Sequence, residues 1–361
     1  MNTRSNHMEQ IMHSLAPFGD TLAVPAPAID PATARHLLQQ HYGMTGVVQR
    51  LTGERDQNFL VKSLQGRDYL LKISHPAEDL ATTDFQTQAL LHIVRTDPTL
   101  PIPHVINTCS GEAWKFLAWD GQAPRAVRLL SYLQGDLLTK VPHSVALRQH
   151  LAAMLARLTI ALRGFFHPAA GHDLHWDLKH AGELRGLLTH VPDKKRRRLA
   201  ELFLDSFDKH AGPQLGRLRA QVVHNDLNDY NVLVDPTNHD RVAGILDFGD
   251  MVHTALVNDL AIAASYRLTD GRDPLGAVSE FVAAYHAVLP LEPMEIDLLF
   301  DLMTTRLVTV VAISGWRAQR HSENRDYILR NNALSWARLE RCAAVSRAQA
   351  QQTLRRACNM K

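Results

Sequence analysis

Three oxygen-bearing side chains stand close together in one short stretch of this 361-residue chain. Asp226 precedes an apolar run that begins at Asn231, and Asp247 follows a second apolar run over 241–246. The turn-rich segment 236–240 separates the two runs, a pattern typical of a β-hairpin. Because a hairpin brings its ends together, we expect Asn231 and Asp247 to face each other, with Asp226 in the adjoining loop. Hard oxygen ligands of this kind suit Mg²⁺, especially when substrate phosphates complete its shell.

The order of these residues indicates the chemistry. The stretch reads His-x-Asp-x4-Asn and then Asp-Phe-Gly, which is how kinases arrange a base and two metal ligands for phosphoryl transfer. Asp-Phe-Gly alone is common, and His224 with Asp226 alone could form a turn or half of a transition-metal site. The complete order, with a hairpin between its halves and a lysine on an upstream strand, is much rarer. We therefore interpret it as a phosphotransfer site.

The composition argues against nucleic acid and membranes as partners. Charged residues make up 21% of the chain and the formal net charge is +2, so no basic surface for nucleic acid or membrane is indicated. No apolar run reaches the length of a membrane span. Residues 1–28 lack the core of a signal peptide and are expected to form a loose Pro/Ala-rich arm. Three widely spaced cysteines favour reduced thiols and a cytoplasmic protein.

The region upstream of the hairpin is predicted to contain a helix and then a sheet. Asp30 and Pro31 are typical of a helix start, and this helix is expected to end at Gly43. Three strands should follow, at 47–51, 58–64 and 69–73.

A lysine interrupts the third of these strands. Lys72 lies within the apolar sequence YLLKIS. It could be an edge-strand lysine facing water, or it could point into a cleft and hold the α- and β-phosphates of a nucleotide. The polar turn 52–56, which contains Gly53, is a candidate loop to cover those phosphates.

A helix over 78–95 is predicted next. Kinases carry on this helix a Glu that pairs with the strand lysine. In this chain Gln86 holds the best-spaced position, and Asp84 stands half a turn earlier. Three further strands and a linker follow, at 104–107, 114–118, 125–130 and 131–136. The linker backbone could present N–H and C=O groups to a purine edge.

The second half of the chain is predicted to be mainly helical. The basic run 194–198 opens an amphipathic segment and is interpreted as a solvated helix face rather than a nucleic-acid site. Arg306 lies inside an otherwise apolar helix, where it could bind a substrate carboxylate or pair with a buried acid such as Asp259. The helices are expected at 145–163, 194–210, from 258 onward, and at 276–288, 294–314 and 327–341.

The segments VVHNDLNDYNVLVD and GILDFGDMVHTALVNDLA resemble the aminoglycoside phosphotransferase (APH) family of small-molecule kinases, over roughly 29–341. Within it, the HNDLNDYN loop, LDFGDMVHT and the tail SENRDYILRNNALSW are most similar to hydroxylysine kinases and to kinase modules fused to class III aminotransferase-like domains. The resemblance implies an α+β, bilobal protein-kinase-like fold. Its small N-lobe, with an antiparallel sheet, would span 29–131. Its larger, mostly helical C-lobe would span 132–345, and 346–361 would form a tail.

The resemblance also implies roles for single residues. Asp226 would be the catalytic base, and Asn231 and Asp247 would bind Mg²⁺. Lys72 and the loop around Gly53 would hold the phosphates of GTP or ATP, with GTP favoured. His224 would brace the catalytic loop, and Asp259 would anchor it. The departure is Gln86 in place of the helix Glu, which leaves Lys72 either neutralised by Asp84 or less tightly fixed.

The acceptor is expected to be an amino alcohol or a hydroxy amino acid, with 5-hydroxy-L-lysine first and homoserine, choline-like alcohols and aminoglycosides as alternatives. Asp229 and Asp250 could contact its ammonium groups, and Arg306 its carboxylate. A protein Ser/Thr kinase would need an activation segment, yet only about ten residues separate Asp247 from Asp259. The intact catalytic residues argue against an inactive binding module.

Overall fold

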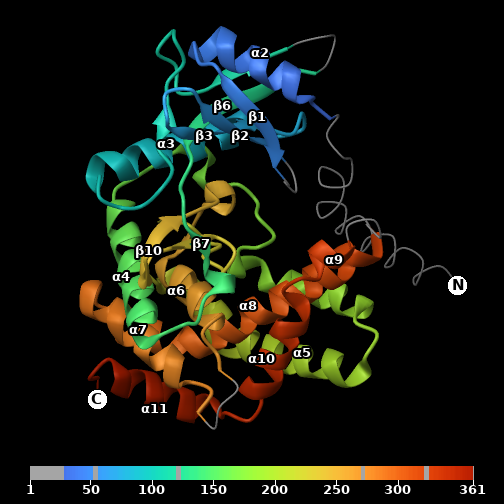
Figure 1. Ribbon diagram of the computed structural model, residues 1–361. Helices are drawn as coiled ribbons and strands as arrows, with labels where there is room; N and C mark the ends of the chain where they lie inside the picture. Colours follow the sequence, from blue (N-terminus) through green and yellow to red (C-terminus); the bar gives the residue numbers. More distant parts are fainter. Residues whose placement is uncertain (1–27, 52–55, 119–122, 270–272, 321–324, 361) are drawn as a thin grey trace, which may run out of the picture. The chain divides into compact units, whose positions relative to one another are not determined.

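The computed structural model describes residues 28–51, 56–118, 123–269, 273–320 and 325–360 (Figure 1). The chain folds as two compact units. The first comprises the described residues up to Thr87 together with His104–Tyr132, and the second comprises Gln88–Pro103 and the chain from Leu133 onward. Within the second unit, Asp97 pairs with Arg157, and Ile245 N donates to the carbonyl of Pro101.

The first helix begins and ends where its capping residues predict. α2 spans Pro31–Tyr42, and the carboxylate of Asp30 accepts hydrogen bonds from the backbone N–H groups of Ala32 and Thr33. Gly43 closes the helix in the left-handed conformation at φ +62°, which glycine adopts without steric cost.

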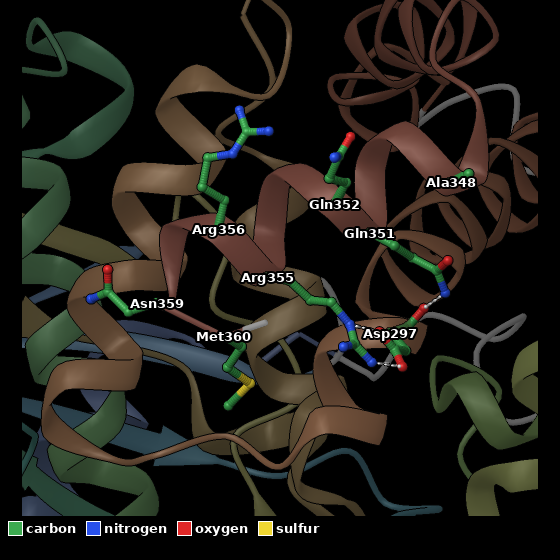
Figure 2. A pocket seen from close by; sticks show the side chains of 8 residues that line it. All are labelled: Asp297, Ala348, Gln351, Gln352, Arg355, Arg356, Asn359 and Met360. Carbon is green, nitrogen blue, oxygen red and sulfur yellow. Dashed lines mark hydrogen bonds and ion pairs between the residues drawn. The ribbon is translucent and has the colours of Figure 1, made fainter.

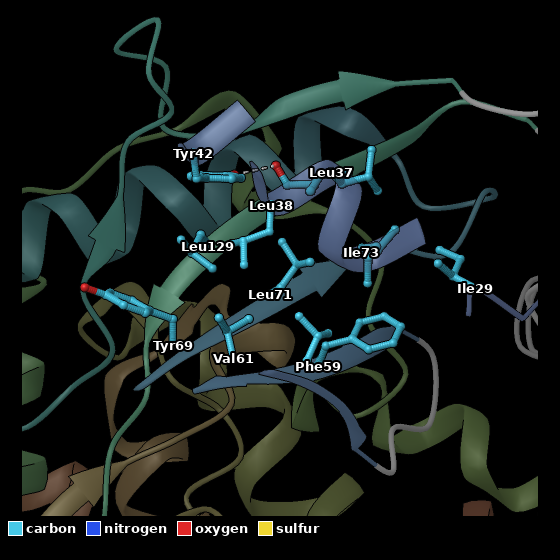
Figure 3. Packing of buried hydrophobic residues seen from close by; sticks show 13 residues of the cluster. Ile29, Leu37, Leu38, Tyr42, Phe59, Val61, Tyr69, Leu71, Ile73 and Leu129 are labelled. Atoms are coloured by element: carbon cyan, nitrogen blue, oxygen red, sulfur yellow. Dashed lines mark hydrogen bonds between the residues drawn. The ribbon is translucent and has the colours of Figure 1, made fainter. Parts of the chain in front are cut away.

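Behind α2 lies an antiparallel sheet with strand order β1-β2-β3-β6-β4, and β5 also pairs with β6. Its strands are β1 Gly46–Leu51, β2 Gln57–Ser63, β3 Asp68–Ile73, β4 Val105–Ile106, β5 Lys115–Leu117 and β6 Arg125–Ser131. Alternate residues of the central strands pack against α2 and form one apolar core (Figure 3), which includes Leu38, Phe59, Val61, Leu71, Ile73 and Leu129. The intervening residues lie on the other face. Lys72 is one of them, and it stands opposite Asn58 on β2 and Arg128 on β6.

In the second unit, α8 (Pro293–Arg320) runs through the centre and is buried along most of its length. A helix covered on nearly every side must be apolar around its circumference, which explains the long apolar run in its sequence. Other helices pack around α8: α5 Lys194–Ser206, α6 Leu256–Ser265, α10 Asn332–Cys342 and α11 Arg347–Ala357. The unit also contains α4 Val145–Ala161 against α7 Gly276–Val288, the 3-10 segment η4 Leu178–His190, and the short strands β7 Asp136–Leu137, β8 Ala220–Val223 and β11 Val252–Ala255.

Three helical segments differ from their predicted extents. The segment expected to be one helix over 327–341 forms α9 (Arg325–Ile328) and α10, and the side chain of Asn332 at the start of α10 bonds to Val311 O and Ser314 Oγ on α8. The predicted tail 346–361 contains α11, whose capping box pairs Ser346 with Gln349. The predicted helix 194–210 is α5 followed by a π-helical turn, Phe207–Ala211.

Within the described parts of the chain, no helix combines the length and the apolar character needed to cross a bilayer. Cys109, Cys342 and Cys358 are free thiols, and burial raises the pKa of Cys342 to about 12.

Candidate active site

The predicted hairpin is present. β9 (Val232–Asp235) pairs antiparallel with β10 (Asn238–Ile245), and β7 pairs with the other edge of β9. Its tight turn is at 236–237, at the start of the predicted turn-rich segment 236–240, where Asp235 accepts a hydrogen bond from Thr237 N at 2.8 Å. Two register shifts in β10 follow.

At the open end of the hairpin, Asn231 and Asp247 were expected to face each other, but they are not directly opposite. Leu246 N donates to Asn231 O at 2.8 Å, so Asp247 lies one residue beyond the position opposite Asn231. Asp247 is exposed and has φ +58°, and its carboxylate accepts a hydrogen bond from Gly249 N. A non-glycine residue in this left-handed region is uncommon, and such positions cluster at functional sites.

The carboxylate of Asp226 is held from both sides. Its Oδ2 accepts hydrogen bonds from the side-chain amides of Asn228 and Asn231, each at 2.8 Å. The same amide of Asn231 also donates to Asp226 O at 2.9 Å. Because the nitrogen of Asn231 is used in this way, its oxygen is the atom that can coordinate a cation.

The other oxygen of Asp226 meets Arg306. Arg306 Nη2 donates to Asp226 Oδ1 at 2.6 Å, its side chain is 4% exposed, and its guanidinium lies 5.3 Å from the ring centroid of Trp176. Arg306 thus pairs with an acid, as one of its two expected roles required, but that acid is the partly exposed Asp226 rather than Asp259. Burial raises the pKa of Asp226 above its ordinary value, and the adjacent guanidinium opposes this rise.

Two residues predicted to brace the catalytic loop do contact it. Asp259, on α6, is fully buried and accepts hydrogen bonds from the backbone N–H groups of His224 and Asn225. Asn225 has φ +64°, so these bonds hold a backbone conformation that is otherwise unfavourable. His224 Nε2 lies 2.9 Å from the carbonyl of Leu246, which ties the loop to the hairpin. Burial raises the pKa of Asp259, while His224 and the two N–H groups lower it.

Asp229 is engaged by a second buried arginine. Its carboxylate forms an ion pair with Arg267, whose side chain is 2% exposed and whose Nη1 also contacts His143 Nδ1 at 3.2 Å. Burial, together with the charges of Arg338 and Arg148, lowers the pKa of Arg267 to about 9. Asp229 therefore neutralises a buried cation.

Asp250 ends the short 3-10 turn η7, Phe248–Asp250, and is half-buried. Its charge is among the groups that raise the pKa of Arg306. Asp250 thus lies within electrostatic reach of the Arg306–Asp226 pair.

In the first unit, the partner of Lys72 was not foreseen. Lys72 Nζ lies 3.1 Å from Asp56 Oδ2, with both side chains half-buried. Gln86 instead accepts a hydrogen bond from Arg128 Nη2 at 2.5 Å, and Asp84 accepts one from Trp114 Nε1 at 3.0 Å. The candidate phosphate-loop residue Gly53 lies outside the described residues.

The donor set at the hairpin fits Mg²⁺ only in combination with a substrate. Among the described residues no group of three or more His, Cys, Asp or Glu side chains could hold a metal by itself. One amide oxygen and one exposed carboxylate are present, from Asn231 and Asp247. Mg²⁺ is commonly bound by one or two protein oxygens together with phosphate oxygens.

A cavity of 670 Å³ lies elsewhere, along α11 (Figure 2). There Arg355 makes two hydrogen bonds to the carboxylate of Asp297, each at 2.6 Å, and Gln351 donates to the carbonyl of the same residue. None of the predicted site residues lines this cavity.

Sequence reasoning did not identify Asp56, Trp176 or Arg267. A charge inside the apolar segment that follows α6 was the available signal for Arg267. Trp176 carries no comparable signal, and Asp56 lies in a polar turn where an acid is ordinary.

Comparisons with known proteins agree with this arrangement. The profile described as "Phosphotransferase enzyme family" (APH) matches residues 47–294. Hydroxylysine kinase from Mus musculus is 26% identical over 335 residues, covering 87% of this chain and 89% of the relative. Homoserine kinase from Methylobacillus flagellatus is 31% identical over 252 residues, covering 66% of this chain and 70% of the relative.

Solved structures share the fold. An amicoumacin kinase, in complex with AMP-PNP, Ca²⁺ and amicoumacin, superposes with a TM-score of 0.64 at 15% identity, covering 87% of this chain and 94% of its own. A microcompartment-associated aminopropanol kinase has a TM-score of 0.62 at 20% identity, covering 90% of this chain and 100% of its own. The predicted protein-kinase-like fold is confirmed.

Proposed function

The chain belongs to the APH phosphotransferase enzyme family, and from this premise we propose that it phosphorylates the hydroxyl of a hydroxy amino acid, with 5-hydroxy-L-lysine as the acceptor. The family and its relatives show a small-molecule phosphotransferase with an alcohol acceptor. The proposal adds the acceptor, the metal and the roles of single residues.

The observation that carries the proposal is the fixed carboxylate of Asp226. Two amides and one guanidinium orient it, beside Asn231 and near the hairpin end that bears Asp247. Phosphoryl transfer requires little covalent chemistry from the protein, but it requires in-line positioning of the acceptor oxygen. Asp226 accepts the hydrogen bond of the acceptor hydroxyl and takes its proton late in the transfer.

Asn231 and Asp247 would hold Mg²⁺ through their side-chain oxygens. Bound there together with the nucleotide, the metal would neutralise charge on the phosphate oxygens. The solved amicoumacin kinase, with AMP-PNP and Ca²⁺, supports a nucleotide and a divalent cation in this fold. GTP or ATP would be the donor.

Lys72 would hold nucleotide phosphates, with Asp56 as its carboxylate partner in place of the helix acid. A carboxylate 3.1 Å from the ammonium can orient the lysine in the way that a helix Glu does in other kinases. Gln86 would support Arg128 instead.

Two observations support an amino-acid acceptor. Hydroxylysine kinases from Mus musculus, Xenopus laevis and Danio rerio align with this chain at 26% identity, and each alignment covers at least 84% of it. In addition, two buried arginines, Arg306 and Arg267, contact the catalytic loop. Cations at this place disfavour a polycationic aminoglycoside. Asp229 neutralises Arg267, so Asp250 is the better candidate to contact a substrate ammonium.

Homoserine is the second candidate, because the homoserine kinase relative has the higher identity, 31%, although over a shorter alignment. Homoserine is also a hydroxy amino acid, so the same catalytic roles would apply to it.

The test is a panel of acceptors given to the purified full-length chain with Mg²⁺ and either ATP or GTP. The panel holds 5-hydroxy-L-lysine, homoserine, aminopropanol, choline and kanamycin, and phosphorylated products are identified by mass spectrometry. We expect the highest kcat/KM with hydroxylysine and no product from kanamycin. Efficient phosphorylation of kanamycin, with hydroxylysine unchanged, would overturn the acceptor.

A further inference from the structure

We propose that the guanidinium of Arg306 binds the carboxylate of the acceptor while it holds the catalytic Asp226, so that one side chain couples substrate recognition to the base. This inference rests on the proposed function and deepens it. It specifies that the acceptor must carry a carboxylate and that Arg306 is the side chain that binds this carboxylate.

The first support is the incomplete hydrogen bonding of a buried cation. Arg306 is 4% exposed, its Nη2 donates to Asp226 Oδ1, and Tyr266 is close enough to help raise its pKa. Its Nε and Nη1 are buried and have no partner in hydrogen-bond geometry within the described chain. A buried N–H without an acceptor costs roughly 1–3 kcal/mol. The fold keeps this cost at the one arginine that contacts the catalytic carboxylate.

The second support is the geometry of the Arg306 guanidinium. The Trp176 ring lies over the guanidinium at 5.3 Å from its centroid, so that face is covered. In the plane of the guanidinium, Nε and Nη1 can each form a two-donor fork with one N–H of Nη2, and the bond from Nη2 to Asp226 leaves one such fork for a ligand. A planar fork of N–H donors matches a carboxylate and binds it more selectively than an ammonium group could.

Comparison with Arg267 separates a structural arginine from a binding one. Arg267 is equally buried, but its Nη2 is used by Asp229 and its Nη1 by His143, which leaves only Nε without a partner. Arg306 has two of its three nitrogens without an acceptor beside the catalytic carboxylate. Arg306 therefore has more unused donors for a ligand than Arg267 has.

The arrangement has a consequence for specificity. An acceptor without a carboxylate would leave the open N–H groups of Arg306 buried and unpaired. Analogues that lack one hydrogen-bonding group are rejected strongly when the site's buried polar groups are left without partners. The enzyme should therefore distinguish a hydroxy amino acid from the amino alcohol of the same chain length.

The test compares two acceptors that differ only in the carboxylate: 5-hydroxy-L-lysine and its decarboxylated diamino alcohol. In the wild type we expect kcat/KM to favour hydroxylysine by about 10–100-fold, the loss of one charged hydrogen-bonded contact. Arg306→Gln should remove most of this preference through a higher KM for hydroxylysine, with the KM for the nucleotide unchanged. Arg320→Gln is the matched control, because Arg320 is exposed at the end of the same helix.

Retention of the wild-type preference by Arg306→Gln, with an equal fall in kcat for both acceptors, would overturn the inference, since Arg306 would then act on Asp226 or on the transferred phosphoryl group alone. Arg306→Lys repeats the comparison with the charge retained and the fork removed. A measurement on the wild type needs no variant: calorimetric binding of lysine and of its decarboxylated diamine. Equal affinities would also overturn the inference.

Failure of the proposed acceptor gives a different pattern. If hydroxylysine is not phosphorylated and homoserine is, the same comparison is made with homoserine and its decarboxylated alcohol. Discrimination by Arg306 in that pair supports the inference, and its absence overturns it. If only alcohols without a carboxylate are phosphorylated, both the proposed function and the inference are wrong.

Discussion

The catalytic loop of the second unit and the lysine strand of the first unit hold their charged groups in different ways. In the loop, Asp226 has three side-chain donors, and Asp259 fixes the backbone through two N–H groups. On β3, Lys72 meets Asp56 in a half-buried ion pair. The loop is fixed by buried contacts, whereas the lysine is held by a pair that solvent partly screens.

The difference indicates which part of the chemistry is preorganised. Rigid hydrogen bonds around a reacting carboxylate avoid reorganisation when charge develops. A half-buried ion pair contributes about 1 kcal/mol or less and is easily exchanged for phosphate oxygens. Changes in the loop should therefore have large effects, and changes around Lys72 small ones.

The largest effect is expected from Asp247→Ala. Loss of a metal-binding carboxylate should reduce kcat by at least about a thousand-fold, because metal neutralisation of phosphate charge contributes several kcal/mol. The measurement is steady-state kinetics across Mg²⁺ concentrations, with circular dichroism to confirm that the fold is intact. Mg²⁺-dependent activity close to that of the wild type would remove the phosphotransfer assignment of the hairpin.

Asp229→Asn should act on stability. It leaves Arg267 buried without its counterion, and breaking such a pair costs about 3 kcal/mol. Urea unfolding should show the loss, with Glu201→Gln on the exposed face of α5 as a control that changes little. A raised KM for the acceptor with unchanged stability would instead assign Asp229 to the substrate ammonium.

Asp56→Asn should have a smaller effect, about a two- to five-fold rise in the KM for the nucleotide, because it removes one partly exposed partner of Lys72. Gln86→Glu, the control, should leave this KM nearly unchanged, since Gln86 contacts Arg128. The opposite pattern, a silent Asp56→Asn and an improved Gln86→Glu, would return the pairing to the helix.

A further effect, on the pH dependence of stability, concerns His143, which contacts Arg267. Burial first, and then the charge of Arg267, lowers the pKa of His143 to about 4 from 6.5. Between these pH values the unfolded chain binds a proton that the folded chain does not, so His143 makes the free energy of unfolding fall as pH falls from 6.5 to 4. After allowance for partial exposure the contribution is roughly 1–2 kcal/mol. His143→Gln should show a shallower slope of unfolding free energy against pH in this window, and an identical slope would contradict the predicted shift.

The parts of the site that the sequence predicts are those that a few consecutive residues define. The hairpin follows from two apolar runs around a turn, and α2 follows from Asp30, Pro31 and Gly43. The pairs Asp226–Arg306 and Asp229–Arg267 join residues about 80 and 40 positions apart, so they depend on how α6 and α8 pack against the loop. Local periodicity carries no information about that packing.

The partner of Lys72 illustrates the same limit. The position of Gln86 on its helix was correctly spaced, but sheet register places Arg128 directly opposite Lys72, and Gln86 bonds to Arg128. The start of α10 likewise contacts a distant segment, since Asn332 bonds to Val311 and Ser314 on α8. In each case spacing leaves open a contact between distant segments.

The most direct test of the central claim is the phosphorylation of 5-hydroxy-L-lysine by the wild type and by Asp226→Asn, followed by mass spectrometry of the product. A positioned base contributes roughly 10²–10⁴-fold. We expect a phosphorylated product from the wild type and a rate lower by about that factor in the variant, with nucleotide binding retained. An Asp226→Asn rate equal to that of the wild type would show that phosphoryl transfer does not depend on this loop.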